Sequence, residues 1–417
     1  MAENKKPAIR FKGFTDAWEQ RQLGEVLSFL KDGTHGTHKN SDEGIYLLSA
    51  KNIKNGEIII DETSDRKISK EEFDVIHSTF KLQRNDVLLT IVGSIGEVAI
   101  LKNPDIMTFQ RSVAFLRPNE ELISSFLKTE IESDVFQKEL SDRKSQSAQP
   151  GVYLGELGKI PFAVPLLKEQ QQIGNYFRNL DTLITLHQRK YDKLVKVKKS
   201  MLEKMFPTNG SKFPEIRFMG FTDAWEQREL GEIMDITSVK RIHQSDWTDS
   251  GIRFLRARDI VSAFKGEELS DYLYISEEKY NEYTALSGKV KVGDLLVTGV
   301  GTIGVPMLIN SDNPIYFKDG NIIWFKNENK IDGQFFYYSF TNTGIQSYIS
   351  ESSGKGTVGT YTIESGKKTP ILLPQNMEEQ KAIGIYFRNL DHLITLHQRK
   401  LEKLKNIKKS MLQKMFL

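Results

Sequence analysis

Asp32, His35 and His38 lie within the segment DGTHGTHK and are the residues of this chain best suited to chemistry. Imidazole and carboxylate groups at such short spacing can chelate a metal ion. No fourth ligand stands out beside them, and the chain has no cysteine. A polar loop, whose hydroxyl, imidazole and lysine groups suit phosphates or base edges, is the better interpretation. We therefore predict a binding loop and no metal.

A second pattern, GVGTIG at residues 299–304, matches the glycine fingerprint of dinucleotide sites. That fingerprint needs a following helix, whose N-terminus holds the pyrophosphate. The segment VPMLIN follows instead, which is strand-like and contains Pro306, so a tight β-turn is favoured over a cofactor site. Ser141 and Lys144 fit SxxK, a short pattern expected by chance, and GxxxxGK[ST], GxSxG and HExxH do not occur. We predict neither a catalytic residue nor a cofactor in this chain.

The composition is that of a globular protein, with 39% hydrophobic and 27% charged residues in 417. The absence of cysteine excludes disulfides and thiolate zinc sites, and it fits a reducing compartment. The start, MAENKKPAIRFKG, has no apolar stretch typical of a secretory signal, and no run of about 18 apolar residues occurs. We expect a cytoplasmic protein without a membrane span.

Two blocks of the sequence occur twice. IRFKGFTDAWEQRQLGE from Ile9 returns as IRFMGFTDAWEQRELGE from Ile216. A longer block from Tyr176, YFRNLDTLITLHQRK, returns from Tyr386 as YFRNLDHLITLHQRK and continues with similar residues to the end. The regions between these blocks diverge and keep only the spacing of turns and apolar runs. The chain therefore predicts two structural units that share one requirement and differ elsewhere.

The second block predicts two long helices. Apolar residues recur with the 4,3 spacing of a coiled-coil seam, and His187, Lys198, His397 and Lys408 fall in the same stripe. Asn376 and Glu379 look like a capping pair for the second helix. About 34 residues at about 1.5 Å each give a rod of roughly 50 Å. The predicted seam consists of Ile173, Phe177, Leu180, Ile184, His187, Leu194, Met201, Ile383, Phe387, Leu390, Ile394, His397, Leu404 and Met411.

Much of the positive charge lies on these helices. The chain has a net charge of +3, yet segments 168–206 and 378–417 each hold nine Lys/Arg against four Asp/Glu. The two interpretations, a solvated helical face and a surface for an acidic partner such as a protein or the DNA backbone, stay equally open. His187 and His397 are best explained as polar seam residues that fix the register.

The divergent regions read mainly as strands, with short apolar runs such as DVLLTIVG and NIIWF bounded by Gly, Asn and Pro. Helices are expected near 122–140 and 333–350. The predicted fold class is α+β: two mixed, β-rich domains joined by two long helices in a pseudo-two-fold repeat, with the two matching seams able to pair helix against helix. The predicted boundaries are 1–167 for the first domain, 168–206 for the first helix, 207–215 for a linker, 216–375 for the second domain and 376–417 for the second helix.

The layout resembles the DNA-specificity (S) subunits of type I restriction–modification systems. The resemblance lies in WEQRQLGEV near the start, in DGTHGT from Asp32, in GDLLVTGVGTIG with its counterpart NDVLLTIVGSIG, and in the segments PLLKEQQQIGNYF and PQNMEEQKAIGIYF that begin each helix. It covers nearly the whole chain. Each motif alone is moderately specific, whereas their order around two long helices is much more so.

The resemblance implies that each divergent region is a target recognition domain for one half of a split site in double-stranded DNA. It also implies that the two helices pair as an antiparallel coiled coil and act as a spacer between the half-sites. Two modification subunits, which bind S-adenosylmethionine and methylate adenine, would dock on the scaffold. Restriction subunits using ATP and Mg would supply translocation and cleavage, and the S subunit itself would be non-catalytic. Because the two domains differ, the target should be asymmetric, with a separation on the order of one helical turn of DNA or slightly more.

Polar and basic loops bounded by glycine supply the candidate DNA contacts, since Arg pairs well with guanine and Asn or Gln with adenine. Ordinary surface charge is the alternative for each of them. The candidates of the first half are Thr34, His35, Thr37, His38, Lys39, Lys51, Asn52, Gln110, Arg111, Arg143, Lys144, Ser145 and Gln146. Those of the second half are Arg241, His243, Arg256, Arg258, Lys318 and Lys355.

Two other functions stay open at this point. A self-sufficient DNA methyltransferase would need an S-adenosylmethionine fold and a motif such as NPPY, and neither is found in the sequence. A coiled-coil protein scaffold without DNA binding is the other alternative, and the acidic balance outside the helices favours it slightly.

Overall fold

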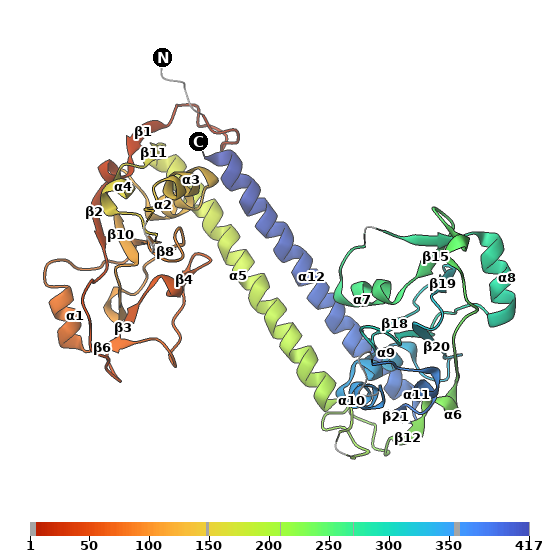
Figure 1. The fold of residues 1–417 in the computed structure, drawn as a ribbon. Coiled ribbons are helices and arrows are strands. Elements are labelled where there is room, and N and C mark those ends of the chain that lie inside the picture. The colour runs from red at the N-terminus through yellow and green to blue at the C-terminus, as the bar shows by residue number, and fades with distance from the viewer. Residues whose placement is uncertain (1–5, 147–149, 209, 270, 354–358, 417) are drawn as a thin grey trace. The chain divides into compact units, whose positions relative to one another are not determined.

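The computed structural model describes residues 6–146, 150–208, 210–269, 271–353 and 359–416. The chain divides into two compact units, residues 1–189 together with 398–417, and residues 190–397. The division crosses both long helices, α5 (Leu167–Lys204) and α12 (Met377–Met415), so that each unit contains a part of each (Figure 1). The helices therefore belong to both units, whereas the predicted boundaries treated them as separate segments.

The first unit is a mixed α+β structure. Its main sheet has the order β2-β10-β7-β8 and is antiparallel, and a smaller sheet, β6-β3-β9, contains the parallel pair β3–β9. The strands are β1 (Glu19–Gln22), β2 (Leu27–Asp32), β3 (Ile45–Leu48), β4 (Ile53–Lys54), β5 (Glu57–Ile58), β6 (Lys67–Ile68), β7 (Val87–Thr90), β8 (Val98–Ile100), β9 (Met107–Phe109), β10 (Val113–Pro118) and β11 (Pro161–Val164). The shorter helices are α1 (Lys70–Ile76), α2 (Ser124–Ile131), α3 (Asp134–Asp142) and α4 (Leu154–Gly158).

The second unit repeats this topology. Its main sheet has the order β13-β20-β17-β18, and its other sheet, β14-β16-β15-β19, contains the parallel pair β15–β19. The strands are β12 (Glu226–Glu229), β13 (Asp235–Thr237), β14 (Trp247–Thr248), β15 (Ile252–Leu255), β16 (Leu273–Ile275), β17 (Leu295–Thr298), β18 (Pro306–Leu308), β19 (Ile315–Phe317), β20 (Ile322–Lys326) and β21 (Pro370–Leu373). The shorter helices are α6 (Leu230–Ile233), α7 (Ala257–Lys265), α8 (Glu277–Ser287), α9 (Gly333–Thr341), α10 (Thr343–Ser352) and α11 (Ile363–Lys367). The α+β class, the internal repeat and the helices expected near 122–140 and 333–350 are confirmed.

The GVGTIG segment is the turn of a β-hairpin. Strand β17 pairs antiparallel with β18 on either side of it. The Thr298 hydroxyl donates a hydrogen bond to the Thr302 carbonyl at 2.5 Å, and Gly301 and Gly304 have φ angles of +77° and +75°, a region that favours glycine. Because a strand follows this turn, no helix N-terminus is available for a pyrophosphate, and the predicted β-turn is confirmed.

The repeated opening segments, residues 9–25 and 216–232, anchor the start of each long helix. Arg10 donates to both carboxylate oxygens of Glu169 in the first turn of α5, at 2.6 and 2.7 Å. Arg217 makes the same pair with Glu379 in α12, at 2.7 and 2.8 Å. Strands β1 and β12, also in these segments, pair with β11 and β21, which immediately precede the helices. The duplicated phrase is thus explained by one structural task performed twice.

The glutamines that follow these glutamates also have equivalent roles. Gln170 donates to the Pro165 carbonyl at 2.9 Å, and Gln380 donates to that of Pro374 at 3.0 Å. The Gln380 side-chain oxygen in turn accepts from the backbone of Asp332, the N-cap of α9. The adjacent glutamate and glutamine at the start of each long helix therefore bind that helix both to the opening segment and to its own domain.

The predicted capping pair of the second helix is only half right. The side-chain oxygen of Asn376 accepts a hydrogen bond from the Glu378 amide at 2.8 Å, as a cap does. The Glu379 side chain, however, is 1% exposed and is bound to Arg217 rather than to the backbone of Asn376. A buried carboxylate next to a guanidinium gains more from that ion pair than from closing a capping box, which is why the local pattern was misleading.

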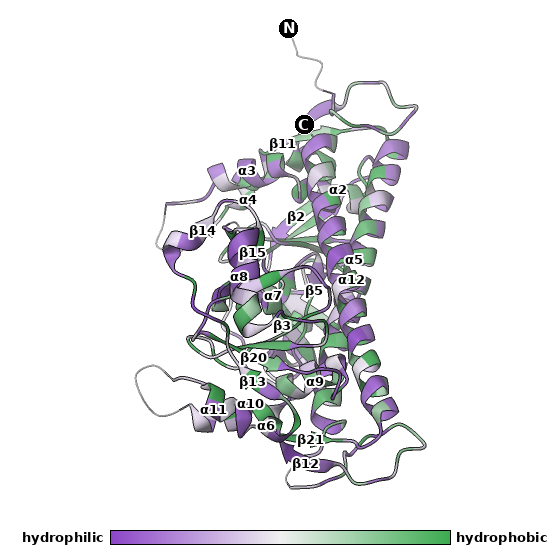
Figure 2. Ribbon diagram, turned by 90° about the vertical axis from the view of Figure 1, so that its right-hand side faces the viewer, coloured by the Kyte–Doolittle hydropathy of each residue, from purple (hydrophilic) through white to green (hydrophobic). Residues whose placement is uncertain are grey.

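The two long helices pair antiparallel within each unit. In the first unit, Phe177 of α5 packs against Phe416 beyond the end of α12, with ring centroids 6.1 Å apart, while Asp181 is bound to Lys408 at 2.6 Å. In the second unit, Lys198 of α5 is bound to Asp391 of α12 at 2.6 Å. Hydrophobic and hydrophilic residues alternate along both helices (Figure 2). The helix pairing predicted from the 4,3 spacing, and the antiparallel direction implied by the resemblance, are confirmed.

The predicted seam residues are all buried or half-buried. In the first unit Ile173, Phe177 and Leu180 lie in one core with Leu404 and Met411. In the second unit Ile383, Phe387 and Leu390 lie in a core with Leu194 and Met201. Ile184, His187, Ile394 and His397 are half-buried between these clusters along the helices. Four residues of the same cores, Val197, Leu202, Ile407 and Leu412, were missed because the strict seam is narrower than the buried face.

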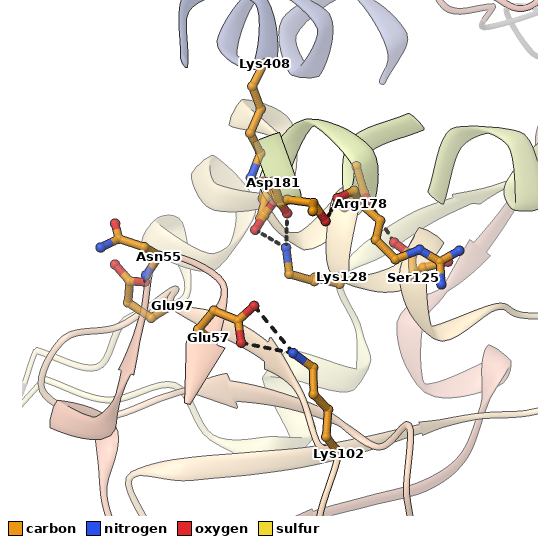
Figure 3. A network of polar contacts seen from close by, with 12 residues as sticks. Asn55, Glu57, Glu97, Lys102, Ser125, Lys128, Arg178, Asp181 and Lys408 are labelled. Carbon is orange, nitrogen blue, oxygen red and sulfur yellow. Dashed lines mark hydrogen bonds and ion pairs between the residues drawn. The ribbon is translucent and has the colours of Figure 1, made fainter. Parts of the chain in front are cut away.

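The two seam lysines are held by aspartates of the opposing helix. Lys128 of α2 and Lys408 of α12 both contact Asp181 of α5, at 2.8 and 2.6 Å (Figure 3). Glu132 completes this network with contacts of 2.7 and 2.8 Å to the same two lysines. In the second unit Asp391 accepts instead from the Tyr338 hydroxyl at 2.7 Å as well as from Lys198. The contacts that attach the globular part of each unit to the long helices are therefore made by different residues.

Glu130 of α2 is a buried carboxyl group that supports a pH prediction. Its Oε1 atom accepts from the Ala163 amide at 3.2 Å, while Oε2 has no hydrogen-bond partner among the described residues. Burial raises the pKa of Glu130 well above its usual value. The folded state then holds a proton that the unfolded state releases above about pH 4.3, so the folded protein loses stability as the pH rises from there through the raised pKa.

We expect Glu130→Gln to remove this loss. Relative to the parent protein, its free energy of unfolding in urea should increase progressively from pH 4.5 to pH 8, because the amide needs no proton to remain buried. Glu139→Gln, at a half-buried position of α3, serves as the control, and its effect on the free energy of unfolding should be small over the same pH range. A difference between Glu130→Gln and the parent that stays constant over this range would contradict the assignment.

Candidate nucleic-acid interface

The candidate contacts gather at equivalent places in the two units. In the first unit, the loop after β2 meets the turn that follows β9, where Thr34 forms a backbone bridge with Gln110. In the second unit, the loop after β13 meets the turn after β19, where Arg241 is bound to Asp319 at 2.9 Å. Strands β9 and β19 are the parallel neighbours of β3 and β15, so one topology positions both sites.

In the first unit, the segment 33–41, here called the first-unit loop, is held by its own polar residues. The Thr34 amide donates to the Phe109 carbonyl at 2.9 Å. A Cβ atom at Gly33 would lie 2.2 Å from the same carbonyl, so this close approach requires glycine. His38 is fixed by Glu72 at 2.7 Å and by Thr34 at 2.6 Å, whereas the His35 side chain is 63% exposed and is bound to Asp32 at 2.6 Å. The loop therefore presents His35 outward and uses His38 as a support.

The structure brings together some of the first-half candidates and separates others. Thr37, Lys39 and Arg111 are exposed on the loop and the adjacent turn. Lys51 is exposed but bound to Asp65 at 2.8 Å. Arg143 is bound to Glu139 at the end of α3, and Ser145 exchanges hydrogen bonds with Gly151, so the run with Lys144 and Gln146 lies on another element.

Asn52 differs from its predicted role. It is 4% exposed, and its amide group donates to the Ile59 carbonyl at 3.0 Å and to Asp65 at 2.7 Å. Its side-chain oxygen accepts from the Ser49 amide. Buried and hydrogen-bonded inside the domain, Asn52 supports the fold and does not belong to the proposed interface.

In the second unit, five of the six candidates line one cavity of about 660 Å³, here called the second-unit cleft. Gln244, Trp247 and Asn321 complete its polar and aromatic lining and were not singled out from the sequence, although Gln244 directly follows a candidate. The remaining candidate, Lys355, lies outside the described residues. The candidates in the cleft are Arg241, His243, Arg256, Arg258 and Lys318.

Acidic side chains balance the arginines of this cleft. Arg256 is 20% exposed and is bound to Asp259 and Asp271. Arg258, at the start of α7, is 53% exposed and shares Asp271. Arg241 is bound to Asp319, which is 12% exposed. The arginines are thus oriented by fixed carboxylates, an arrangement suited to recognition of a particular acceptor pattern.

Features of other site classes are not found in the described part of the chain. No group of three or more His, Cys, Asp or Glu residues there could hold a metal ion. Among the same residues, no helix combines the length and the apolar character needed to cross a membrane.

The fold and the two sites define a class of protein, one with two unlike binding units built on a repeated helical frame. The family described as the type I restriction modification DNA specificity domain matches this chain twice, at residues 15–196 and 222–406. The chain belongs to this family. It is a DNA-recognition subunit with two target recognition domains, and it is not the catalytic component.

Known relatives agree with this assignment over nearly the full length. The chain is 25% identical to the type I restriction enzyme MjaVIII specificity subunit of Methanocaldococcus jannaschii, over 95% of this chain and 91% of the relative. It is 24% identical to the putative MjaX specificity subunit of the same organism, over 95% and 92%. The crystal structure of the S subunit from M. genitalium has the same fold, with a TM-score of 0.64, 15% identity and coverage of 99% of each chain.

Proposed function

We propose that this specificity subunit reads an asymmetric, bipartite target in double-stranded DNA, with one recognition unit for each half-site. One observation carries the proposal: equivalent loops and turns in the two units bear different chemistry. The first unit exposes hydroxyl, imidazole and ammonium groups on its loop, with Arg111 on the adjacent turn, whereas the second lines its cleft with guanidinium groups held by carboxylates. Because these groups match different base edges, the two half-sites should differ.

The long helices are proposed to set the gap between the half-sites. Their 38 and 39 residues correspond to a length of about 57–59 Å each. The antiparallel contacts within each unit, including the Lys198–Asp391 and Lys408–Asp181 ion pairs, support a fixed register between the helices. A fixed register favours one separation over a range of separations, which corresponds to a defined gap in the target.

The proposed partners are two modification subunits, carrying S-adenosylmethionine, and restriction subunits that use ATP and Mg, all acting in the cytoplasm. Support for two equal docking positions comes from leucines that are exposed on both helices at repeated positions. Leu183 and Leu186 are 43% and 45% exposed, and Leu393 and Leu396 are 40% and 38% exposed. Exposed leucines kept in both copies are typical of a surface that a partner covers.

The proposal is tested with the chain assembled with its modification subunits. Sequencing methylated adenines in the genome of cells that carry the complex should yield one motif of two unlike half-sites at a constant gap. Binding of the complex to that duplex should weaken steeply with salt, as phosphate contacts require. A symmetric motif or a variable gap would contradict the bipartite assignment. If no methylated motif and no salt-dependent binding were found, the scaffold alternative would replace the proposal.

A further inference from the structure

The arginines of the second-unit cleft differ in how many of their donors remain available. All three guanidinium nitrogens of Arg256 are engaged: Nε and Nη2 with Asp259, Nη1 with the Asp271 carboxylate, and Nη2 also with the Asp271 carbonyl at 2.6 Å. Arg256 therefore holds the cleft together and is a positioning residue. Among the described residues, Arg241 is engaged only through Nε, which donates to Asp319 Oδ2 at 2.9 Å, and its side chain is 68% exposed.

The backbone around Arg241 is fixed on both sides. Ile242 is 2% exposed and lies in the core of the domain. The carbonyl of Lys240 accepts a hydrogen bond from the Tyr316 hydroxyl at 2.8 Å. Burial raises the pKa of Tyr316 to about 12, so this hydroxyl remains a donor over the physiological range. Arg241 is thus presented from an anchored segment, and the entropy lost when it binds a partner is small.

The carboxylate of Asp319 determines which group of the DNA Arg241 can bind. It occupies Nε–H and leaves Nη1 and Nη2 as a planar pair of donors. It also places a negative charge beside the arginine, as Asp271 does beside Arg258. Because these carboxylates offset much of the positive charge of the cleft, its attraction for a phosphate is reduced, whereas hydrogen bonding to a neutral base edge with two acceptors depends less on net charge. In the major groove only guanine offers two acceptors on one base, O6 and N7.

We propose that Arg241 reads a guanine in the half-site of the second unit, and that Asp319 positions it for this contact. The inference rests on the proposed function and adds the base that one residue recognises. The turns that follow β9 and β19 are equivalent, because the amide of Gln110 donates to the Leu48 carbonyl and the amide of Lys318 donates to the Leu255 carbonyl. The next residue is Arg111 in the first unit and Asp319 in the second. The first unit therefore lacks an equivalent of the Arg241–Asp319 pair, and we expect it to read its half-site with other residues.

The first experiment uses the unmodified complex with its modification subunits and the mapped target duplex. Each guanine of the second half-site is replaced in turn by 7-deazaguanine, which lacks the N7 acceptor, or by hypoxanthine, which keeps O6 and N7. At one position 7-deazaguanine should weaken binding about 10-fold or more while hypoxanthine has a much smaller effect. If no guanine position showed this pattern, the proposal would be overturned by this experiment alone, before any variant of the chain is tested.

The second experiment compares variants of the chain in the same complex. Arg241→Ala should relax specificity at that one base pair by about 10- to 100-fold, and 7-deazaguanine should then have no further effect. Asp319→Asn should relax the same position, and the double variant should lose no more than Arg241→Ala alone, because the two residues act as a unit. Arg228→Ala on β12, which is 40% exposed and bound to Glu226 and Glu232, is the matched control.

The outcomes separate this inference from the proposed function. Arg241 would be a phosphate contact if Arg241→Ala weakened binding to all sequences alike and lowered the slope of the logarithm of the binding constant against the logarithm of the salt concentration by about 1. The bipartite target would still stand in that case. If no sequence-specific target existed in the first place, the proposed function itself would fall, and with it the role of Arg241. A relaxation at a position that holds no guanine would overturn the inference alone.

Discussion

Replacing Arg217 with methionine is expected to lower the free energy of unfolding by about 3–5 kcal/mol. The substitution leaves the Glu379 carboxylate, whose side chain is 1% exposed, without its bidentate partner. Only the Trp225 indole would still donate to it, at 3.3 Å. Hydrogen bonding to Glu379 raises the pKa of Arg217, so the guanidinium is charged at every accessible pH and the loss should be seen at pH 7. Urea unfolding of the full chain, followed by tryptophan fluorescence, measures it.

A second variant identifies the cause. Arg217→Met combined with Glu379→Gln should recover most of the lost stability, because a neutral amide is far less costly to bury than an unpaired carboxylate. Arg228→Met, at an exposed ion pair on the neighbouring strand, should cost at most about 1 kcal/mol. A loss of similar size in Arg217→Met and in the double variant would show that packing of the arginine stem, and not the buried charge, accounts for the effect.

Exchange of the second variable region is expected to change one half-site completely and to leave the other unchanged. Residues 233–369, which lie between the second opening segment and β21, are replaced by the equivalent segment of a relative with a different target, so that both opening segments and both long helices are retained. Binding to the original target should fall to the non-specific level, a loss of about 1,000-fold or more. The methylated motif of the hybrid should keep the first half-site and the gap, because the first unit and the helices are untouched.

In the matched control, the chain's own segment is put back at the same two junctions, and this version should give the original methylated motif. Methylation mapping of cells that carry either version provides the measurement. A change in both half-sites, or in the gap, would show that the recognition units are not independent, and the assignment of one unit to each half-site would then be wrong.

The sequence by itself determined the plan of the protein. The duplicated segments predicted two units, and the 4,3 spacing through Phe177 and Phe387 predicted two long helices with a common seam. These predictions succeeded because they depend on periodicity, which is local: a side chain's face on a helix follows from its position along the chain. The strand–turn–strand interpretation of GVGTIG succeeded for the same reason, since the residues that follow the turn already exclude a helix.

Only the tertiary structure showed which candidate residues are exposed and which are buried in support of the fold. Asn52 and Arg241 were equal candidates in the sequence, yet one is buried with its amide bound and the other is 68% exposed. Glu379 was predicted to cap a helix and instead binds Arg217, 162 residues away. The partner of Arg241, Asp319, likewise lies 78 residues away, in the turn after β19. Such pairings depend on which distant segments the fold brings together, and no spacing along the chain encodes that distance.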